Sequence, residues 1–223
     1  MRSIIKQTLS LFSTIPTVGL FCQGRILAKV KKGVSTRERI IATARSLFAA
    51  GGYAGTSTDL ILEQSGVSRG ALYHHFENKE ALFAAVLEAV EIDVTNATAR
   101  ARGDITDPAE ALAAGCNAFL DMACDAEVRQ IILIDAHSVV GWQKWREIES
   151  RYGFGRVKQA MTAIAAAGRI PAESAEMFAH ITLASLLEIA FVIARSPDPA
   201  AAAQAGRKAM EELLTRMIGP PSV

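Results

Sequence analysis

Arginine, hydroxyl and imidazole side chains gather in one short segment of the chain. Residues 66–76 read Gly-Val-Ser-Arg-Gly-Ala-Leu-Tyr-His-His-Phe, and residues 78–82 read Asn-Lys-Glu-Ala-Leu. A guanidinium offers a planar fork of donors to base edges, while hydroxyl, imidazole and ammonium groups donate to phosphate oxygens. The segment therefore predicts contact with nucleic acid.

Each of these side chains has a predicted role at DNA. Arg69 lies near the start of a helix, where its fork can reach O6 and N7 of guanine. Gly70 has no side chain, so the helix backbone can press against the duplex, and Ala71 can touch a thymine methyl. Donors to phosphate oxygens are predicted at Thr56, Ser57, Ser68, Tyr73, His74 and Lys79.

Two short helices are predicted to position this segment. The first runs from about residue 56 to Ser65, and the second begins at the N-cap Ser68 and runs to about Phe76. Gly66 lies between them and suits a turn with positive φ. Two helices joined by a tight turn form a helix-turn-helix, whose second helix can enter the major groove. In it, Leu72 and Phe76 are interpreted as core, and His75 as a packed ring rather than a DNA contact.

Two longer helices are predicted to flank this pair. A capping box at Ser35–Glu38 opens the first, whose apolar residues recur at helical spacing until Gly51–Gly52 ends it. The other opens at Asn78 and runs to about Arg102, linking the N-terminal helices to the rest of the chain.

The segment resembles the signature of the TetR family of transcriptional regulators. In that family, Gly-Val-Ser-x-Gly-x-Leu-Tyr-x-His-Phe precedes x-x-Lys-Glu-x-Leu, and residues 66–82 follow this pattern. Thr56, Ser57 and Ile61 extend the match upstream. Residues 60–62 depart from it, because the family more often has a polar residue and alanine around the isoleucine, and this departure can shift the packing of that helix.

The resemblance implies an N-terminal helix-turn-helix domain at residues 34–80 and a C-terminal ligand-binding and dimerisation domain at residues 81–223. It implies a homodimer that binds a palindromic operator in double-stranded DNA. It also implies a repressor that a small-molecule effector releases from that operator, with no cofactor and no enzymatic activity.

Composition agrees with an all-α fold. Half of the chain is hydrophobic, but only 6% is aromatic, and the difference is mostly alanine, the best helix former. Net charge is +1, yet residues 29–80 hold eight Lys and Arg against five Asp and Glu, and residues 81–223 hold thirteen against eighteen. A basic N-terminal module on an acidic body is typical of a phosphate-facing head.

Helices are predicted throughout the second domain as well. Asp107–Glu110 forms a second capping box, with proline at the first helical position. Residues 131–134 fit a strand when taken alone, but their surroundings favour a buried helix. Further helices are predicted at about residues 142–167, 173–195 and 199–218, with Asp125 and Asp198 as caps.

Aromatic and methionine side chains of this domain are candidates for lining an effector cavity. They are Phe119, Met122, Trp142, Trp145, Phe154 and Met161. Asp121, Asp135 and His137 offer metal-ligating atoms, but no spaced pair of histidines accompanies them, so no metal site is predicted. An enzyme would need convergent acids, bases or nucleophiles, and the sequence shows no such cluster. A ligand-binding module without DNA would leave the motif at residues 66–82 unexplained.

The segment from Glu173 to Arg195 is apolar almost all round. A helix without a polar face must be covered on every side, and a second subunit is the expected cover. The last helix carries apolar residues on one face and is predicted to complete a four-helix interface across a twofold axis. These residues are Met210, Leu213, Leu214 and Met217. Charges at Leu187 and Leu214 should then break the dimer.

The first thirty-three residues show no helical pattern. Arg2 and Lys6 precede a loosely apolar stretch at residues 9–22, which is too short and too polar to span a membrane. The segment is interpreted as a disordered extension or a start-site artefact, with a basic arm at residues 29–32 that can touch DNA. Three cysteines at spacings unlike those of a metal site indicate a reducing compartment. The protein is therefore predicted to be cytoplasmic, without a membrane partner.

Overall fold

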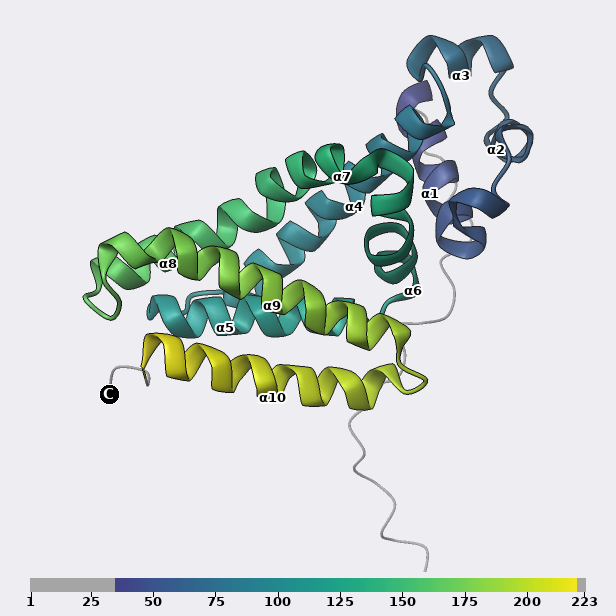
Figure 1. The fold of residues 1–223 in the computed structure, drawn as a ribbon. Coiled ribbons are helices and arrows are strands. Elements are labelled where there is room, and N and C mark those ends of the chain that lie inside the picture. Colours follow the sequence, from purple (N-terminus) through teal and green to yellow (C-terminus); the bar gives the residue numbers. More distant parts are fainter. Residues whose placement is uncertain (1–34, 220–223) are drawn as a thin grey trace, which may run out of the picture. The chain divides into compact units, whose positions relative to one another are not determined.

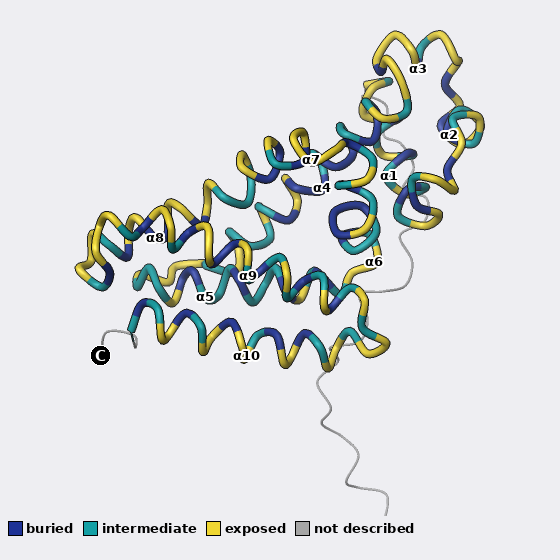
Figure 2. The backbone as a smooth tube through the Cα atoms, viewed as in Figure 1, coloured by how far each residue is buried: buried dark blue, intermediate teal, exposed yellow. Residues whose placement is uncertain are grey.

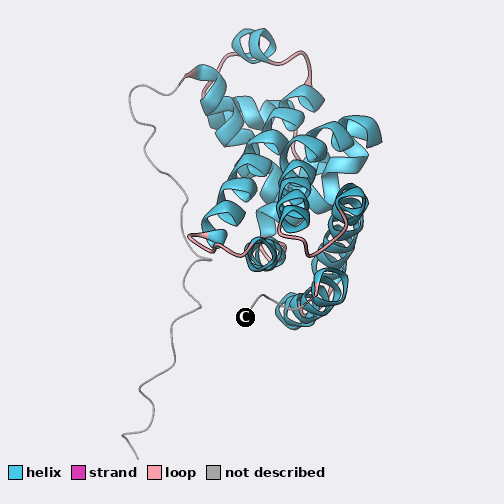
Figure 3. Ribbon diagram, turned by 90° about the vertical axis from the view of Figure 1, so that its left-hand side faces the viewer, coloured by secondary structure: helices cyan, strands magenta, loops and turns pink. Residues whose placement is uncertain are grey.

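Every regular element between residues 35 and 219, the part of the chain that the structure describes, is a helix (Figures 1 and 3). In this computed structural model the predicted all-α fold is confirmed. The predictions for residues 1–33, for the basic arm at residues 29–32 and for Cys22 lie outside the described residues.

The N-terminal helices begin where side chains cap them. These helices are α1 (Thr36–Gly55), α2 (Thr58–Ser65), α3 (Arg69–His75) and α4 (Lys79–Arg102). Ser35 accepts from the amide of Glu38 at 3.2 Å, and the Glu38 carboxylate accepts from the amide of Ser35 at 2.9 Å, which is the predicted capping box. Ser57, Ser68 and Asn78 cap the next three helices, each by accepting from the amide three residues further on.

Gly52 interrupts α1, where the sequence predicts the end of the first helix. Its φ of 68° and ψ of 170° are not helical, and the chain then makes one further turn to Gly55. The extra turn is held from outside, because the amide of Tyr53 donates to Asp135 at 2.8 Å. The residues around Gly52 do not predict this contact, because Asp135 lies 82 positions further along the chain than Tyr53.

The rest of the described chain, together with the later turns of α4, forms the body of the protein. Its helices are α5 (Pro108–Met122), α6 (Ala126–Val128), α7 (Ala136–Glu149), α8 (Gly155–Ala166), α9 (Ala175–Arg195) and α10 (Pro199–Ile218). Wider π-helical turns, η1 (Arg129–Asp135) and η2 (Ser150–Phe154), and a short 3-10 turn, η3 (Ala172–Ser174), connect them. Asp107, Asp125 and Asp198 cap α5, α6 and α10, as predicted.

Two irregular turns refine the predicted helices of the body. Residues 131–133 are buried within η1, as expected of a buried helix, but Ile134 is 51% exposed. The predicted helix at about residues 142–167 corresponds to most of α7 together with η2 and α8, which continue one another. Its start coincides with a bend at Gly141, where φ is 75° and ψ is 160°.

The packing of α9 and α10 is unusually close. A Cβ built on Gly206 of α10 would lie 2.5 Å from Cγ2 of Ile189 on α9, so any larger residue here would force the Ile189 side chain to move. Buried and exposed positions alternate along α5, α9 and α10 (Figure 2). The segment Ala172–Arg195 is long and apolar enough to cross a membrane, with mean hydropathy 2.0, and 33% of its most apolar stretch is buried inside the chain. Much of α9 therefore faces outward.

Two residues predicted to lie in the dimer interface are instead internal. Leu214 is 5% exposed and belongs to the core. Leu187 is half-buried and lines a cavity described below. Met210, on the same predicted face of α10, is also buried. The expectation that charges at Leu187 and Leu214 test the interface is therefore wrong, because both would disturb the interior of one subunit.

Candidate DNA-binding surface and effector cavity

The turn between α2 and α3 is tight and firmly packed. Gly66 follows α2 in the left-handed conformation, with φ of 63° and ψ of 24°, as predicted. Ile61 and Leu72 bury their side chains against a core in which the rings of Phe48 and Phe83 lie 5.2 Å apart. The two short helices thus form a helix-turn-helix that a solid core holds in place.

The outer side of α3 carries most of the residues predicted to meet DNA. Exposed residues of α3 and its N-cap are Ser68, Arg69, Gly70, Tyr73 and His74, and Ala71 is half-buried. Ser57, the N-cap of α2, is exposed as well. A Cβ added at Gly70 would meet nothing within 4 Å, so this side of the helix is open. These side chains are therefore accessible to a partner, as contact with DNA requires.

Two side chains of this surface lie differently from expectation. Arg69 forms an ion pair with Asp59 of α2, so its guanidinium is held over the first helix of the pair. His75 is exposed, and its ring lies 5.2 Å from that of His74. The interpretation of His75 as a packed ring is thus wrong, because its position on α3 faces away from the core.

Thr56 and Lys79 are part of the support beneath this surface. Thr56 is 1% exposed, and its hydroxyl donates to the carbonyls of Gly52 at 2.8 Å and Leu47 at 3.2 Å. The Lys79 ammonium donates to the carbonyls of Tyr53 and Thr56, both at 3.0 Å, and lies 3.9 Å from the centre of the Tyr53 ring. The predicted phosphate contact of Thr56 is therefore wrong, because its hydroxyl is enclosed. Lys79 is half-buried and supports the C-terminal turn of α1, and its phosphate contact stays a prediction.

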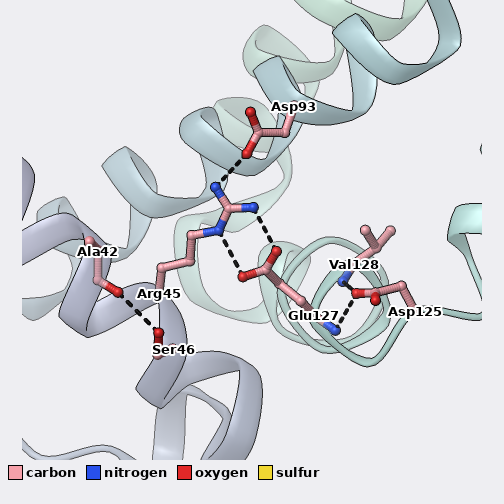
Figure 4. A network of polar contacts seen from close by, with 7 residues as sticks. All are labelled: Ala42, Arg45, Ser46, Asp93, Asp125, Glu127 and Val128. Atoms are coloured by element: carbon pink, nitrogen blue, oxygen red, sulfur yellow. Dashed lines mark hydrogen bonds and ion pairs between the residues drawn. The ribbon is translucent and has the colours of Figure 1, made fainter. Parts of the chain in front are cut away.

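Arg45 joins α1 to two other helices (Figure 4). Its Nε and Nη2 donate to both carboxylate oxygens of Glu127 at 2.7 and 2.6 Å, and its Nη1 donates to Asp93 at 2.5 Å. These bonds, that to Glu127 most, raise the pKa of the guanidinium above its usual value. Asp125 fixes the helix that carries Glu127 by accepting from the amides of Glu127 and Val128.

Asp135, the last residue of η1, holds the bend of α1. Its Oδ2 accepts from the amide of Tyr53 at 2.8 Å and from Nε2 of Gln130 at 3.0 Å. A Cβ built on Gly52 would lie 3.0 Å from that Nε2 atom. The α1 backbone and η1 therefore approach each other closely at residue 52.

A cavity lies within the body, walled by α4, α5, α7, α8 and α9 with η1 and η2. Its empty volume is about 880 Å³, counting the solvent-open space at its mouth. Its walls are mainly apolar, and include Val94, Leu112, Phe119, Ile132, Trp145, Val157, Leu183, Leu186 and Leu187. Apolar walls with a few polar groups are typical of sites that bind small organic molecules.

Two of the six predicted lining residues reach this cavity, namely Phe119 and Trp145. The other four are corrected. Met161 is fully buried in the core, and Met122 packs against the core at the end of α5. Trp142 is 65% exposed, because it follows the bend in α7. Phe154 is half-buried and stacks on His180, with ring centres 4.2 Å apart.

Two buried carboxyl groups interrupt the apolar walls. Glu91 of α4 is 7% exposed and Glu149 of α7 is 5% exposed. Oε2 of Glu149 accepts from Arg146 at 3.2 Å, while its Oε1 is buried without a hydrogen-bond partner. Burial raises the pKa of both carboxyl groups, and the charge of Glu149 adds to the effect on Glu91, whose pKa is raised to about 7. Two arginines also line the cavity: Arg102 is half-buried and Arg156 is exposed.

The side chains weighed as metal ligands have other contacts. Asp121 pairs with Arg207, Asp135 holds α1, and the ring of His137 lies 3.9 Å from that of Trp145. Within residues 35–219, no group of three or more His, Cys, Asp or Glu side chains is placed to hold a metal ion.

Comparison with known proteins identifies the family. The family described as bacterial regulatory proteins, tetR family, matches residues 40–86, and the tetracyclin repressor-like C-terminal domain matches residues 109–217. The solved structure of a TetR-family transcriptional regulator from Pectobacterium atrosepticum is 32% identical to this chain, covers 84% of this chain and 96% of its own, and has a TM-score of 0.72. The chain belongs to the TetR family of transcriptional regulators.

Two further relatives support the TetR assignment. The Transposon Tn10 TetC protein of Escherichia coli is 26% identical over 156 residues, which make up 70% of this chain and 79% of that protein. The structure of RolR in complex with resorcinol is 23% identical, covers 82% of this chain and 87% of its own, and has a TM-score of 0.64, which shows the same fold. As a TetR-family regulator, the protein binds DNA through its helix-turn-helix.

Sequence reasoning missed several residues that this TetR-family structure makes important. Glu91 had a usable signal, since it lies four residues after Leu87 and three before Val94, on the apolar face of α4. Arg45 and Asp135 had none, because their partners lie far along the chain. Glu149 follows a run of charged residues and looks like part of a solvated face.

Proposed function

We propose that this protein is a homodimeric repressor that leaves a palindromic operator when a small molecule fills the cavity of its body. One observation carries the proposal: η1 contributes Ile132 to the cavity wall and Asp135 to the bend of α1. A molecule that moves this wall therefore acts on the helix that supports the DNA-binding surface. RolR, which shares the fold, was solved with the small molecule resorcinol.

The helix-turn-helix would read DNA through the exposed side of α3. Arg69 would exchange Asp59 for guanine, and Gly70 and Ala71 would let the helix approach the base edges. Phosphate contacts would come from Ser57, Ser68, Tyr73 and His74, which are all exposed. In this proposal residues 34–80 form the DNA-binding domain and residues 81–223 the sensing and dimerising domain.

A second copy of the chain would cover the outward face of α9. Met177, Ile181 and Val192 are 61%, 40% and 56% exposed, and their spacing places them on one side of this helix. Apolar side chains in such a row favour burial between subunits. Two subunits related by a twofold axis would present their α3 helices to successive major grooves.

Coupling between the cavity and DNA would use the two attachments of α1. The cavity wall reaches α1 through Asp135, while Arg45 ties the same helix to Glu127 and Asp93. An effector that favours a shifted η1 would change the spacing of the two heads in the dimer. Such a coupling typically amounts to about 1–3 kcal/mol.

The protein would act in the cytoplasm, where its operator DNA is, without enzymatic activity and without a cofactor. Cys116 and Cys124 are free thiols, which agrees with a reducing compartment. Burial raises the pKa of Cys116 to about 12, so this thiol stays protonated and serves as core.

Selection of duplexes from a random pool by the purified full chain tests the proposal. The selected sequences should share a palindrome with half-sites spaced by whole helical turns. Arg69→Ala should relax base preference at one position in each half-site, by about 1–3 kcal/mol. Selection of no common sequence by the wild type would contradict the operator-binding role.

Sedimentation tests the dimer separately. The wild type should sediment as a dimer at micromolar concentration, and Ile181→Glu should give a folded monomer because residue 181 faces outward. Glu176→Gln, on the same helix but outside this row and paired with Lys158 of α8, serves as the matched control. A monomeric wild type would refute the proposed interface.

A further inference from the structure

Glu149 has a buried oxygen with nothing to bind. Its side chain is almost fully enclosed, Arg146 occupies Oε2, and Oε1 accepts no hydrogen bond. The backbone also crowds this oxygen, since a Cβ on Gly153 would lie 3.3 Å from it. A buried carboxylate oxygen without a donor is strongly unfavourable, so the open space of the cavity is where its partner must come from.

Glu91 lines the same cavity and is also short of partners. It is almost fully buried, and within residues 35–219 it forms no hydrogen bond or ion pair. Both side chains line this cavity, and the charge of Glu149 raises the pKa of Glu91. This end of the cavity thus holds two carboxyl groups against one arginine, Arg146, whose side chain is 41% exposed.

We propose that the effector is an apolar molecule with a protonated amine, and that the amine binds between Glu91 and Glu149. Its N–H groups would donate to Oε1 of Glu149 and to Glu91, and its positive charge would balance the second carboxylate. This inference rests on the proposed function, because it takes the cavity to be the effector site.

The rest of the cavity wall is long and mainly apolar. Along α4 the lining residues run from Glu91 through Val94 and Ala99 to Arg102, a rise of about 16 Å. Leu112, Phe119 and Leu186 add apolar groups from other helices. An acidic group on the effector would meet two buried carboxyl groups, whereas the two arginines of the lining, Arg102 and Arg156, are reached by solvent.

Charge also separates an amine from a neutral alcohol. A hydroxyl group can satisfy Oε1 of Glu149, but it leaves the excess negative charge of the pair in place. An amine supplies the same hydrogen bond and the compensating charge, and hydrogen bonds between ionised groups are the stronger kind. Amine binding should therefore favour the ionised form of Glu91 and release protons near neutral pH.

Three probes with one apolar body test the class of effector: 4-phenylbutylamine, 4-phenylbutanol and 4-phenylbutanoate. Calorimetric titration of the full chain should give an affinity for the amine about tenfold or more above that for the alcohol, with the carboxylate weakest. Titrations in buffers of different ionisation enthalpy should show proton release for the amine alone.

Two variants locate the interaction. Glu149→Gln and Glu91→Gln keep the side-chain shape and should each lower amine affinity about tenfold while leaving alcohol affinity unchanged. Glu147→Gln is the matched control, because Glu147 is exposed on the same helix and pairs with Lys144 outside the cavity. Circular dichroism melts check that all three variants are folded.

The outcomes separate this inference from the proposed function. If the alcohol binds as tightly as the amine and releases operator DNA, the amine assignment is wrong and the sensing role stands. The amine assignment is also wrong if the carboxylate binds tightest, or if both glutamine variants bind the amine like the wild type. If no probe binds a chain that still binds its operator, both the inference and the sensing role of the cavity are overturned.

Discussion

The DNA-binding head, formed by α1, α2, α3 and the start of α4, and the body use the same element, the α-helix, for opposite purposes. In the head, Phe48 and Phe83 are fully buried and fill the space between helices, so that function lies on the outside of α3. In the body, the helices leave a mainly apolar cavity between them. A solid unit can present a fixed surface to DNA, whereas a hollow one can change when a molecule enters it.

Removing one large aromatic side chain from each region should expose this difference most strongly. Phe48→Ala removes a ring that contacts Phe83 and Tyr53 in a filled core, and should lower the free energy of unfolding by about 3–5 kcal/mol. Phe119→Ala enlarges an existing cavity and should cost less, about 1 kcal/mol, because Phe119 is only half-buried. Chemical denaturation measures both.

The ranking of the two variants is the decisive result. Phe119→Ala should also change the affinity of cavity ligands, while operator affinity of the folded protein stays close to wild type. Equal losses of stability in the two variants would mean that the body is as tightly packed as the head, and the contrast between them would fail.

The buried acids of the body should make its stability depend on pH. The pKa of Glu91 is raised to about 7 from an ordinary value of 4.5, so the folded state binds its proton more tightly than the unfolded state. The resulting stability is complete below pH 4.5 and is lost as pH rises through 7, by up to about 3 kcal/mol. Glu149 faces the same cavity, and burial shifts its pKa in the same direction.

Glu91→Gln is the variant that isolates this effect. It keeps a neutral group at every pH, so it should match the wild type near pH 5 and exceed its stability near pH 8. Glu147→Gln, exposed on α7, should follow the wild type throughout. A difference between Glu91→Gln and wild type that stays constant with pH would show that Glu91 does not titrate in this range.

The same contrast explains what the sequence could predict. The capping serines, Gly66 and the residues of α3 act through neighbours a few positions away, so their order alone indicates a helix-turn-helix. Even there, the hydrogen bonds of Thr56 and Lys79 to the end of α1 were not predicted. A hydroxyl or ammonium group that reaches a phosphate and one that closes a helix end are preceded and followed by the same residues.

In the body, residue type alone did not predict which side chains line the cavity. Trp145 and Trp142 are three residues apart, yet the first is buried at the cavity and the second is largely exposed. The bend at Gly141 and the wider turns η1 and η2 set which side of each helix faces inward. None of these three features changes the spacing of hydrophobic residues enough to be recognised in the sequence. Glu91 and Glu149 carry the cavity's chemistry, and charged residues are normally assigned to the surface.

Lys79 and Arg69 offer a finer test within the head itself. Lys79→Ala removes a donor from the carbonyls of Tyr53 and Thr56, although that of Tyr53 keeps the amide of Thr56, and should destabilise the protein by about 1–2 kcal/mol. Arg69→Ala should leave stability nearly unchanged, because its pair with Asp59 is exposed. Thermal melts compare the two variants, and shift assays across several salt concentrations report DNA contacts.

Salt dependence decides between the two roles of Lys79. A lysine that neutralises a phosphate contributes about one unit to the slope of log affinity against log salt. If Lys79 only supports α1, the slope should stay at the wild-type value after correction for folded protein. A slope reduced by one unit, with unchanged stability, would restore the phosphate role predicted from the sequence.

The smallest expected effect concerns Arg45, where the head meets the rest of the chain. Its ion pairs with Glu127 and Asp93 are partly exposed, and solvent weakens them, so Arg45→Met should cost only about 1 kcal/mol of stability. Its larger consequence should be on coupling, because the hydrogen bond of Asp135 would then be the remaining one of the two polar links described above between α1 and the body. A cavity ligand should then change operator affinity by a different factor than in wild type.

Asp93→Asn is the matched control, since it removes only the more exposed of the two pairs. Operator affinity measured with and without ligand gives the coupling, and an unchanged ratio in Arg45→Met would assign the transmission to η1 alone.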